Sequence, residues 1–237
     1  MARGGIVYPC AGLSPEDHLV RLGNGREARG MDGKESDGEA KRLEDLWSGS
    51  FGDAYVDRNA GAYDLRGPFW RNVIDRLSPT RVLEVGCNTG GNLRWIAPLL
   101  EPASTYGVDI NRKALALLHE TQPDVNALIG SAKDLPFRDS WFDLVFTMGV
   151  LIHQPDDSLP DVLREMARCS SAYLLCGEYF AEQVTEVAYR GVPGALFKRD
   201  YGRLFLEAIP GLALVDSGHL TAEEGFDDIT WWLFRKA

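Results

Sequence analysis

The feature that most constrains this chain is a glycine-rich loop between an apolar run and a helix-like run. The β-rich run 82–85 leads directly into the small-residue segment 86–91. A helix-like run at 92–100 follows, and Pro98 is expected to shorten it. A strand, a tight glycine turn and a helix N-terminus bring backbone N–H groups together where a ligand can meet them. The segment therefore predicts a ligand site at this turn.

The chain after Arg81 alternates between strand-like and helix-like patterns. Such alternation predicts an α/β fold, with a parallel sheet and helices on both faces. The expected strands are 82–86, 104–109, 125–129, 142–147 and 172–176, and the expected helices are 92–100, 111–121 and 158–169. Near the end, the strand-like runs 212–217 and 229–235 have no convincing helix between them. The run 229–235 is apolar at both its odd and its even positions, so we expect both faces of this strand to be buried.

The chain before the glycine loop is expected to have two parts. Residues 1–40 are glycine-rich, carry mixed charges and show no apolar period, which predicts a flexible arm. Residues 41–79 are expected to form a helical lid, in which the longest helix begins at Gly67-Pro68 and ends at Ser78-Pro79. Shorter helices are expected at 40–47 and 51–59. Residues 80–237 would then form the α/β domain.

Composition narrows the range of partners and locations. The 237 residues carry a net charge of −10, so neither nucleic acid nor an anionic membrane is an expected partner. The cysteines at 10, 87, 169 and 176 form no C-x-x-C pair and the histidines are scattered, so we expect no disulfide framework and no metal site. The N-terminal apolar run is too short for a good signal peptide, and no apolar run reaches about 18 residues. These features predict a cytoplasmic protein and leave its oligomeric state unknown.

Side chains around the loop distinguish between classes of ligand. No Gly-Lys-Ser/Thr follows, so this is not a phosphate-binding Walker loop. Asn88 stands where a dinucleotide-binding loop needs a glycine to approach a pyrophosphate. Glu84 would repel phosphates and would suit an ammonium group or a water network. Asp109 ends the next apolar run, where an acid can bind ribose hydroxyls. The pattern predicts an adenosine-type ligand without a pyrophosphate.

The order of these residues resembles that of class I methyltransferases, which use S-adenosylmethionine. The resemblance rests on Glu84-x-Gly86-x-Asn88-x-Gly90, Gly-Val-Asp109 and Phe-Asp143-Leu-Val-Phe. It implies a Rossmann-like sheet of seven strands, mostly parallel, in which the last strand is antiparallel and inserted. Further landmarks resemble the subfamily of pseudaminic acid biosynthesis-associated methylases over roughly residues 45 to 236; they lie at 51–59, 86–93, 146–153, 189–191, 196–202 and 228–234.

This resemblance implies a set of cofactor-binding residues. Glu84 would lie near the amino group of the methionine part, Asp109 would accept hydrogen bonds from the ribose, and Ile110 would pack on the adenine. Many relatives carry an acid for the adenine amino group where this chain has Ser131, so Ser131 or Asp134 is expected to replace it. The full implied set is Glu84, Gly86, Asn88, Gly90, Asp109, Ile110, Ser131, Ala132, Met148 and Gly149. Tyr55 and Arg58 on the expected helix 51–59 are further cofactor-binding candidates, since they could close over the cofactor.

Candidates for catalysis follow the expected fourth and fifth strands, at the edge where open α/β sheets bind ligands. His153 is a candidate general base, since histidine titrates near neutral pH. A cluster of basic and aromatic side chains could clamp a carboxylate, because arginine binds such groups bidentately. The catalytic candidates are His153, Glu178, Tyr179 and Tyr189, and the substrate-binding candidates are Arg190, Lys198 and Arg199.

The predicted function is S-adenosylmethionine-dependent methyl transfer to an amino or hydroxyl group of a small metabolite. A sugar, an amino acid or a secondary-metabolite precursor would fit. One alternative keeps the cofactor, because sequences similar to the subfamily include cyclases that form azetidine-2-carboxylate. There the α-amine attacks the γ-carbon and 5′-methylthioadenosine leaves. Another alternative is a cofactor-binding protein that has lost catalysis.

Overall fold

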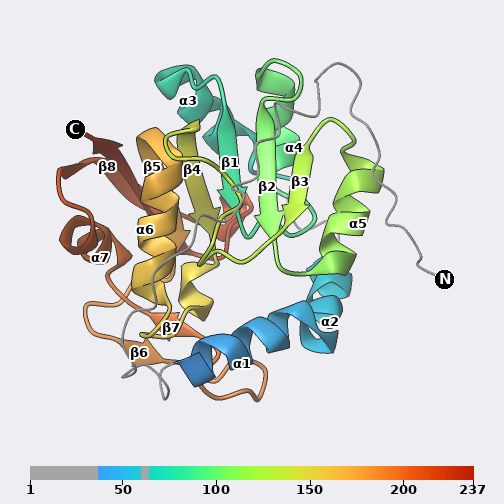
Figure 1. Ribbon diagram of the computed structural model, residues 1–237, viewed down its shortest axis with the longest axis vertical. Coiled ribbons are helices and arrows are strands. Elements are labelled where there is room, and N and C mark those ends of the chain that lie inside the picture. Colours follow the sequence, from blue (N-terminus) through green and yellow to red (C-terminus); the bar gives the residue numbers. More distant parts are fainter. Residues whose placement is uncertain (1–36, 60–63) are drawn as a thin grey trace.

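A sheet of seven strands forms the centre of the computed structural model, which describes residues 37–59 and 64–237 (Figure 1). The predicted arm therefore lies outside the described residues, apart from 37–40. The strands of this sheet are β1 (Val82–Val85), β2 (Thr105–Asp109), β3 (Asn126–Ile129), β4 (Phe142–Met148), β5 (Ser170–Glu178), β8 (Leu212–Leu220) and β9 (Ile229–Lys236). Their order across the sheet is β3-β2-β1-β4-β5-β9-β8.

The pairing of the strands confirms the predicted architecture. Strands β1 to β5 pair in parallel, whereas β9 pairs antiparallel with both β5 and β8. The last strand is thus inserted inside the sheet, and its side chains Trp232, Leu233 and Phe234 are buried. Side chains on both faces of β9 are apolar because the strand lies inside the sheet and both of its faces are covered.

The helices also follow the predicted pattern in most places. They are α1 (Asp37–Ser48), α2 (Ser50–Asn59), α3 (Gly67–Leu77), α4 (Leu93–Ile96), α5 (Arg112–Thr121), α6 (Leu159–Cys169) and α7 (Tyr201–Ala208), with 3-10 turns η1 (Ala97–Leu99), η2 (Leu151–His153) and η3 (Ala222–Glu224). Helix α3 begins with Pro68 in its first turn and ends at Ser78, whose φ of 46° stops it. Helix α4 gives way to η1 at Pro98.

Two helical layers cover the sheet. Helices α6 and α7 pack on one face, and α3, α4 and α5 pack on the other. Because side chains alternate along a strand, Leu83 and Val85 face α6, while Val82 and Glu84 face the α3–α4 side. Trp70 of α3 is fully buried against Phe146, with ring centroids 4.4 Å apart. Helix α3 is therefore part of this layer, and α1 and α2 are the helices of residues 37–59 and 64–237 that lie over the ligand edge.

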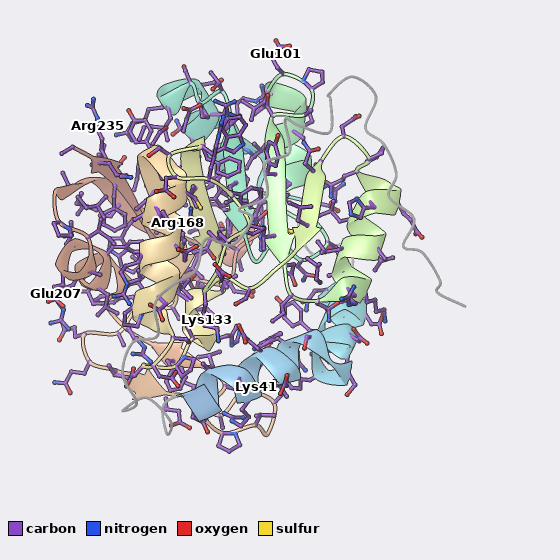
Figure 2. The ribbon with its side chains drawn as sticks, viewed as in Figure 1. Lys41, Glu101, Lys133, Arg168, Glu207 and Arg235 are labelled. Carbon is purple, nitrogen blue, oxygen red and sulfur yellow. The ribbon has the colours of Figure 1, made fainter. Side chains whose placement is uncertain are left out.

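The order of the strands reverses between β1 and β4, and ligands bind in such folds beyond the carboxyl ends at this switch point. Helices α1 and α2 lie beyond those ends, next to a hairpin of β6 (Thr185–Glu186) and β7 (Phe197–Lys198) (Figure 1). Charged side chains such as Glu101, Glu207 and Arg235 point outward from the two layers (Figure 2).

The hairpin and α7 were not among the predicted elements. Each is short, and α7 has too few turns to show a clear apolar period. Its formation depends on tertiary packing, because Tyr201 and Phe205 are buried and Phe205 lies 5.1 Å from the ring of Phe234. Asp200 caps the helix by accepting a hydrogen bond from the backbone N–H of Arg203.

No helix within residues 37–59 and 64–237 has both the length and the apolar character needed to span a bilayer.

Candidate functional site

A cavity of about 690 Å³ lies at the carboxyl ends of the central strands, under α1 and α2. Its volume falls in the range of sites that enclose one drug-sized ligand. Fourteen of the predicted site residues line it: Tyr55, Glu84, Gly86, Asn88, Asp109, Ile110, Ser131, Ala132, Met148, Gly149, His153, Tyr179, Tyr189 and Arg190. The cavity thus brings together residues from both ends of the described chain.

The glycine loop approaches the cavity with its backbone. The N–H of Gly86 donates to the carbonyl of Val108 at 2.7 Å, which fixes the loop to β2. A Cβ at Gly86 would come within 2.3 Å of Val150 Cγ2, and its φ is +76°, so only glycine fits here. Gly90 lies behind the loop, where a Cβ would meet the amide of Gln122 at 2.4 Å. The loop therefore needs both glycines for its shape, although only Gly86 lines the cavity.

Asn88 occupies the left-handed region at a φ of +47°, which asparagine tolerates better than most residues. Its backbone N–H donates to Asp109 Oδ2 at 2.8 Å. Its own side-chain oxygen, Oδ1, is buried and has no hydrogen-bond partner. The side chain thus presents an unpaired acceptor where a dinucleotide-binding loop would have a glycine.

Asp109 at the end of β2 is held by backbone donors from both sides. Oδ2 accepts from Asn88, and Oδ1 accepts from the N–H of Asn111 at 2.8 Å. Burial raises the pKa of Asp109, while these backbone hydrogen bonds lower it. A backbone hydrogen bond from Ile110 also reaches this carboxylate, which has about four acceptor sites, so the group keeps acceptor capacity for a hydroxyl donor from the cavity.

Glu84 on β1 is a buried acid with half of its carboxylate unpaired. Oε1 accepts from Asn92 Nδ2 at 2.6 Å, whereas Oε2 is buried and has no partner. Asn92 is itself fixed by Arg66 and Trp70, which donate to its Oδ1 at 2.9 and 3.1 Å. Burial raises the pKa of Glu84 to about 8, although the hydrogen bond from Asn92 and the charge of Arg66 lower it. A cation in the cavity would be complementary to this oxygen.

The loop after β3 meets the lid helix. Ser131 Oγ donates to Glu44 Oε1 of α1 at 2.5 Å, and Lys133 Nζ lies 3.1 Å from Glu44 Oε2. Lys133 lies between the sheet and α1 (Figure 2). Asp134, the other predicted substitute for the missing acid, is exposed and does not line the cavity. The acid nearest to Ser131 therefore comes from α1.

His153 at the end of η2 faces the cavity with one ring nitrogen. Nδ1 lies 2.5 Å from the carbonyl of Ala195. A carbonyl can only accept, so Nδ1 carries the proton of the neutral ring and Nε2 keeps its lone pair. Burial lowers the pKa of His153 to about 4, although the hydrogen bond to Ala195 raises it. The ring is therefore neutral near pH 7 and can accept a proton at Nε2.

Aromatic rings form the wall of the cavity beside His153. The ring of Trp47 lies 4.4 Å from that of His153 and 5.3 Å from that of Tyr55, and Tyr189 lies 5.3 Å from His153. Trp47 Nε1 is buried without a hydrogen-bond partner. Arg190 follows Tyr189 at a φ of +52° and also lines the cavity. Non-glycine residues in this region of φ store strain, which is often found at functional sites.

Five of the predicted residues lie outside the cavity wall. Gly90 acts through the loop, as described above, and Arg58 is exposed on α2. Lys198 Nζ lies 5.4 Å from the ring centroid of Tyr179, and Arg199 is buried in an ion pair with Asp156.

Glu178 is the fifth of these residues and is fully buried beneath η2. Its carboxylate accepts from the backbone N–H groups of Val150, Leu151 and Ile152 at 3.1 to 3.2 Å. This arrangement gives Glu178 a structural role in holding η2, rather than the substrate contact that its strand-end position predicted.

The cavity wall also includes residues outside the predicted set, among them Glu44, Arg66, Asn92, Asp227 and Asp228. Asn92 was visible in the loop motif, and its place before a helix could have marked it. Residues 40, 43 and 47 have helical spacing, which could have indicated that one face of α1 is covered. No local pattern indicates that this face covers the ligand edge of the sheet.

The sheet order, the inserted antiparallel strand and the cavity at the strand ends define the Rossmann-like fold of class I methyltransferases. Residues 82–171, from β1 to the start of β5, match the family described as "Methyltransferase domain". Two solved methyltransferases have the same fold. The 1,6-didemethyltoxoflavin-N1-methyltransferase of Burkholderia thailandensis, with bound S-adenosylhomocysteine, has a TM-score of 0.63 at 16% identity, covering 90% of this chain and 93% of that chain. Magnesium protoporphyrin IX methyltransferase of Synechocystis, with bound S-adenosylmethionine, has a TM-score of 0.61 at 14% identity, covering 84% and 97%.

Among curated proteins, phthiotriol/phenolphthiotriol dimycocerosates methyltransferase 1 of Mycobacterium ulcerans is 41% identical over 71 residues. The match covers 29% of this chain and 26% of that relative, so the likeness is confined to part of both proteins. The matched domain, together with the solved neighbours that hold S-adenosylmethionine or S-adenosylhomocysteine, supports S-adenosylmethionine as the cofactor.

Proposed function

We propose that this chain is an S-adenosylmethionine-dependent methyltransferase that acts on an amino or hydroxyl group of a small metabolite. The narrower resemblance to the pseudaminic acid biosynthesis-associated methylases, and a location in the cytoplasm, belong to the same proposal. So does the division into an arm at 1–40, a helical lid at 41–79 and a domain at 80–237, except that α3 packs on the sheet, so that the proposed lid consists of α1 and α2.

The proposal rests on unpaired polar atoms in the cavity wall. Within the described part of the chain, Glu84 Oε2, Asn88 Oδ1 and Trp47 Nε1 are buried without hydrogen-bond partners. Such an atom costs about 1–3 kcal/mol when left unsatisfied, so this wall favours a polar ligand. Glu84 suits the ammonium group of the methionine part, and Asp109 suits a ribose hydroxyl. The residues present therefore fit the cofactor.

The residues at the end of β4 would hold the reacting centre. S-adenosylmethionine supplies a methyl group on a cationic sulfonium, which an amine or hydroxyl displaces directly. A Cβ added at Gly149 would meet no atom within 4 Å, so the backbone leaves open space beside Met148. The rings of Trp47, Tyr55 and Tyr189 would favour a nearby cation by about 0.5–2 kcal/mol.

His153 is the proposed general base. Its Nε2 lone pair faces the cavity, and the fixed Nδ1 hydrogen bond holds the ring in one orientation. A base with a pKa near 4 does not remove a proton from a resting alcohol or ammonium group. With a hydroxyl acceptor, it can take the proton that the oxygen loses as the new bond to carbon forms, because that oxygen then becomes strongly acidic. An amine acceptor must arrive in its neutral form, and its methylated product keeps the proton as an ammonium group. Tyr179 and Tyr189 would orient the acceptor.

The size of the cavity favours a small acceptor. The walls enclose about 690 Å³, and the cofactor itself must share this space. Helix α1 is joined across the opening to the β6–β7 hairpin, where Arg42 Nη2 donates to the carbonyl of Gly194 at 3.1 Å. Arg190 lines the same side, so an acceptor that carries a carboxylate would gain a partner.

An assay with isotopically labelled S-adenosylmethionine tests the proposal. The protein is incubated with panels of small amines, amino acids and sugars, and the products are identified by mass spectrometry. We expect a labelled methyl group on one small acceptor together with S-adenosylhomocysteine, and no product from a long-chain fatty acid or a porphyrin. Release of 5′-methylthioadenosine from S-adenosylmethionine alone, above the spontaneous rate, would overturn methyl transfer and favour the cyclisation. Cofactor binding without any product would favour a non-catalytic protein.

A further inference from the structure

We infer that Glu44 of the lid helix α1 is the carboxylate that recognises the exocyclic amino group of adenine. The adenine end of the site would then be complete only with the lid in place. This inference rests on the proposed function for the identity of the cofactor, and it adds a specificity-determining residue that comes from outside the 80–237 domain.

The adenine base would lie beside the turn that follows β3. Asp109 ends β2, and it pairs in register with Ile129 at the end of the adjacent strand β3. The N–H of Gly130 donates to the carbonyl of Asp109 at 3.0 Å, which fixes the next turn beside the acid. A nucleoside whose ribose is bound at Asp109 therefore places its base between Ile110 and the turn 130–132, all of which line the cavity.

Ser131 and Glu44 provide hydrogen-bond acceptors beside that turn. Ser131 has no charge to offer. Its hydroxyl donates to Glu44 Oε1 at 2.5 Å and accepts from the backbone N–H of Lys133 at 3.2 Å, so it keeps one lone pair for a ligand. Glu44 lines the cavity and retains unused acceptor sites on its carboxylate. Two acceptors side by side match the two N–H donors of the adenine amino group. They would oppose the carbonyl that hypoxanthine carries at the same ring position.

Contacts to the rest of the protein fix the position of Glu44. Its Oε2 is paired with Lys133 at 3.1 Å. Helix α1 is also held near its C-terminus, where Asn111 Nδ2 donates to the carbonyl of Trp47 at 3.1 Å and to Asp53 Oδ1 of α2 at 3.0 Å. Asn111 follows Asp109 by two residues, so the same turn that would bind the ribose also holds the lid. Recognition of the base and closure of α1 are therefore coupled in this geometry.

Calorimetric binding of two product analogues tests the inference without any turnover. The probes are S-adenosylhomocysteine and S-inosylhomocysteine. In the second, a carbonyl replaces the adenine amino group and N1 carries a proton, so the Glu44 variants are needed to assign the preference to the amino group. We expect the wild type to prefer the adenosine form by about 10-fold to 100-fold, the loss that accompanies a missing hydrogen bond to a charged group. Glu44→Ala should reduce this preference to within about twofold, mainly by weakening the adenosine form.

Matched variants distinguish recognition of the adenine amino group by Glu44 from a role of Glu44 in holding α1 in place. Lys133→Ala removes the ion pair to the lid and leaves Ser131 and Glu44 in place, so it should weaken both probes equally and keep the preference. Asp134→Asn, on the exposed neighbour, should change neither affinity. Glu44→Gln, with its single carbonyl oxygen, should lie between the wild type and Glu44→Ala. Thermal unfolding of each variant verifies that it is folded.

Two results would overturn the inference alone. In one, Glu44→Ala weakens both probes by the same factor, which means that Glu44 only holds α1 in place. In the other, the wild type binds both probes equally while Asp109→Ala still weakens them. A wild type that binds neither probe would overturn the proposed function as well, and this outcome is distinct from the other two.

Discussion

Two buried glutamates, Glu84 on β1 and Glu178 on β5, look alike by burial and differ in what surrounds their oxygens. Both are almost fully buried at strands of the same sheet, and burial raises the pKa of each to about 8. All the acceptor needs of Glu178 are met by three backbone N–H groups, and it lies outside the cavity wall. Glu84 has one oxygen with no partner, and it lines the cavity. The difference teaches that a raised pKa alone does not distinguish the two acids. An unpaired oxygen in the cavity wall does distinguish them, and we propose that it marks the acid that binds the cofactor.

Removal of the Glu178 carboxylate should give the largest effect, and that effect should be on stability. Glu178→Ala leaves three buried N–H groups without an acceptor, and each such group costs about 1–3 kcal/mol. We expect a loss of roughly 3–5 kcal/mol in the free energy of unfolding after local relaxation, and a fall in Tm on the order of 10 °C. Denaturant and thermal unfolding measure both quantities. Glu178→Gln keeps one acceptor oxygen and should lose less.

An unchanged Tm for Glu178→Ala would contradict the structural role assigned to this residue. Cofactor affinity serves as the second readout. Since Glu178 does not touch the cavity, the folded fraction of the variant should bind S-adenosylmethionine with an affinity close to that of the wild type.

Glu84→Gln should show the opposite pattern. The amide oxygen can still accept from Asn92, so we expect the free energy of unfolding to stay within about 1 kcal/mol of the wild-type value. The unpaired Oε2 is replaced by an amide that cannot pair with an ammonium group. Calorimetry should therefore show S-adenosylmethionine affinity reduced by about 10-fold to 100-fold. Full affinity in a folded Glu84→Gln protein would refute the functional half of the comparison.

Asp109 lies between these two extremes, because its carboxylate holds two backbone N–H groups and also faces the cavity. Asp109→Ala should weaken S-adenosylmethionine binding by about tenfold or more, since a lost hydrogen bond to a charged group costs about 1.5–3 kcal/mol. It should also lower stability, though by less than Glu178→Ala. Asp109→Asn, which keeps one acceptor oxygen, is the matched control. Calorimetry that shows unchanged affinity for Asp109→Ala would place the ribose elsewhere.

The same comparison explains how far sequence alone could reach. The run from β1 through the glycine loop to Asp109 is local, because a strand, a turn with positive φ and a helix start each have short-range signals. The alternation of elements predicted a parallel sheet with helices on both faces, and the inserted antiparallel last strand followed from the resemblance to class I methyltransferases. The placing of Glu84, the glycine loop and Asp109 around one cavity was therefore predictable from the sequence, whereas S-adenosylmethionine followed from the resemblance.

The surroundings of Glu178 and Glu44 could not be predicted from local sequence signals. Whether an acid at the end of a strand is free depends on the path of a distant segment, here the backbone of 150–152. Whether a lid helix presents Glu44 to the loop after β3 depends on how α1 crosses the sheet. Both features depend on tertiary packing and leave no periodic pattern in the local sequence. The sequence therefore could not indicate that backbone N–H groups bind Glu178, or that Glu44 rather than Asp134 lies at Ser131.

The pH dependence of cofactor binding should give the smallest effect and the most direct test of the unpaired oxygen. In the free protein the pKa of Glu84 is raised to about 8, so its neutral form dominates at pH 7. Pairing with an ammonium group requires the ionised form, and binding should therefore strengthen as pH rises toward 8 and release a proton. Between pH 7 and 8 the ionised fraction rises from about a tenth to about a half, which sets an upper limit of roughly fivefold on the gain in affinity.

Calorimetry in two buffers with different heats of ionisation measures this affinity and the number of protons released. Glu84→Gln should bind with little pH dependence over the same range and release no proton. Glu178→Gln removes an acid of equally raised pKa that lies outside the cavity wall, so it should retain the wild-type slope. If the slope were lost in Glu178→Gln and kept in Glu84→Gln, the titrating group would be the acid without a free oxygen, and the distinction between the two glutamates would fail.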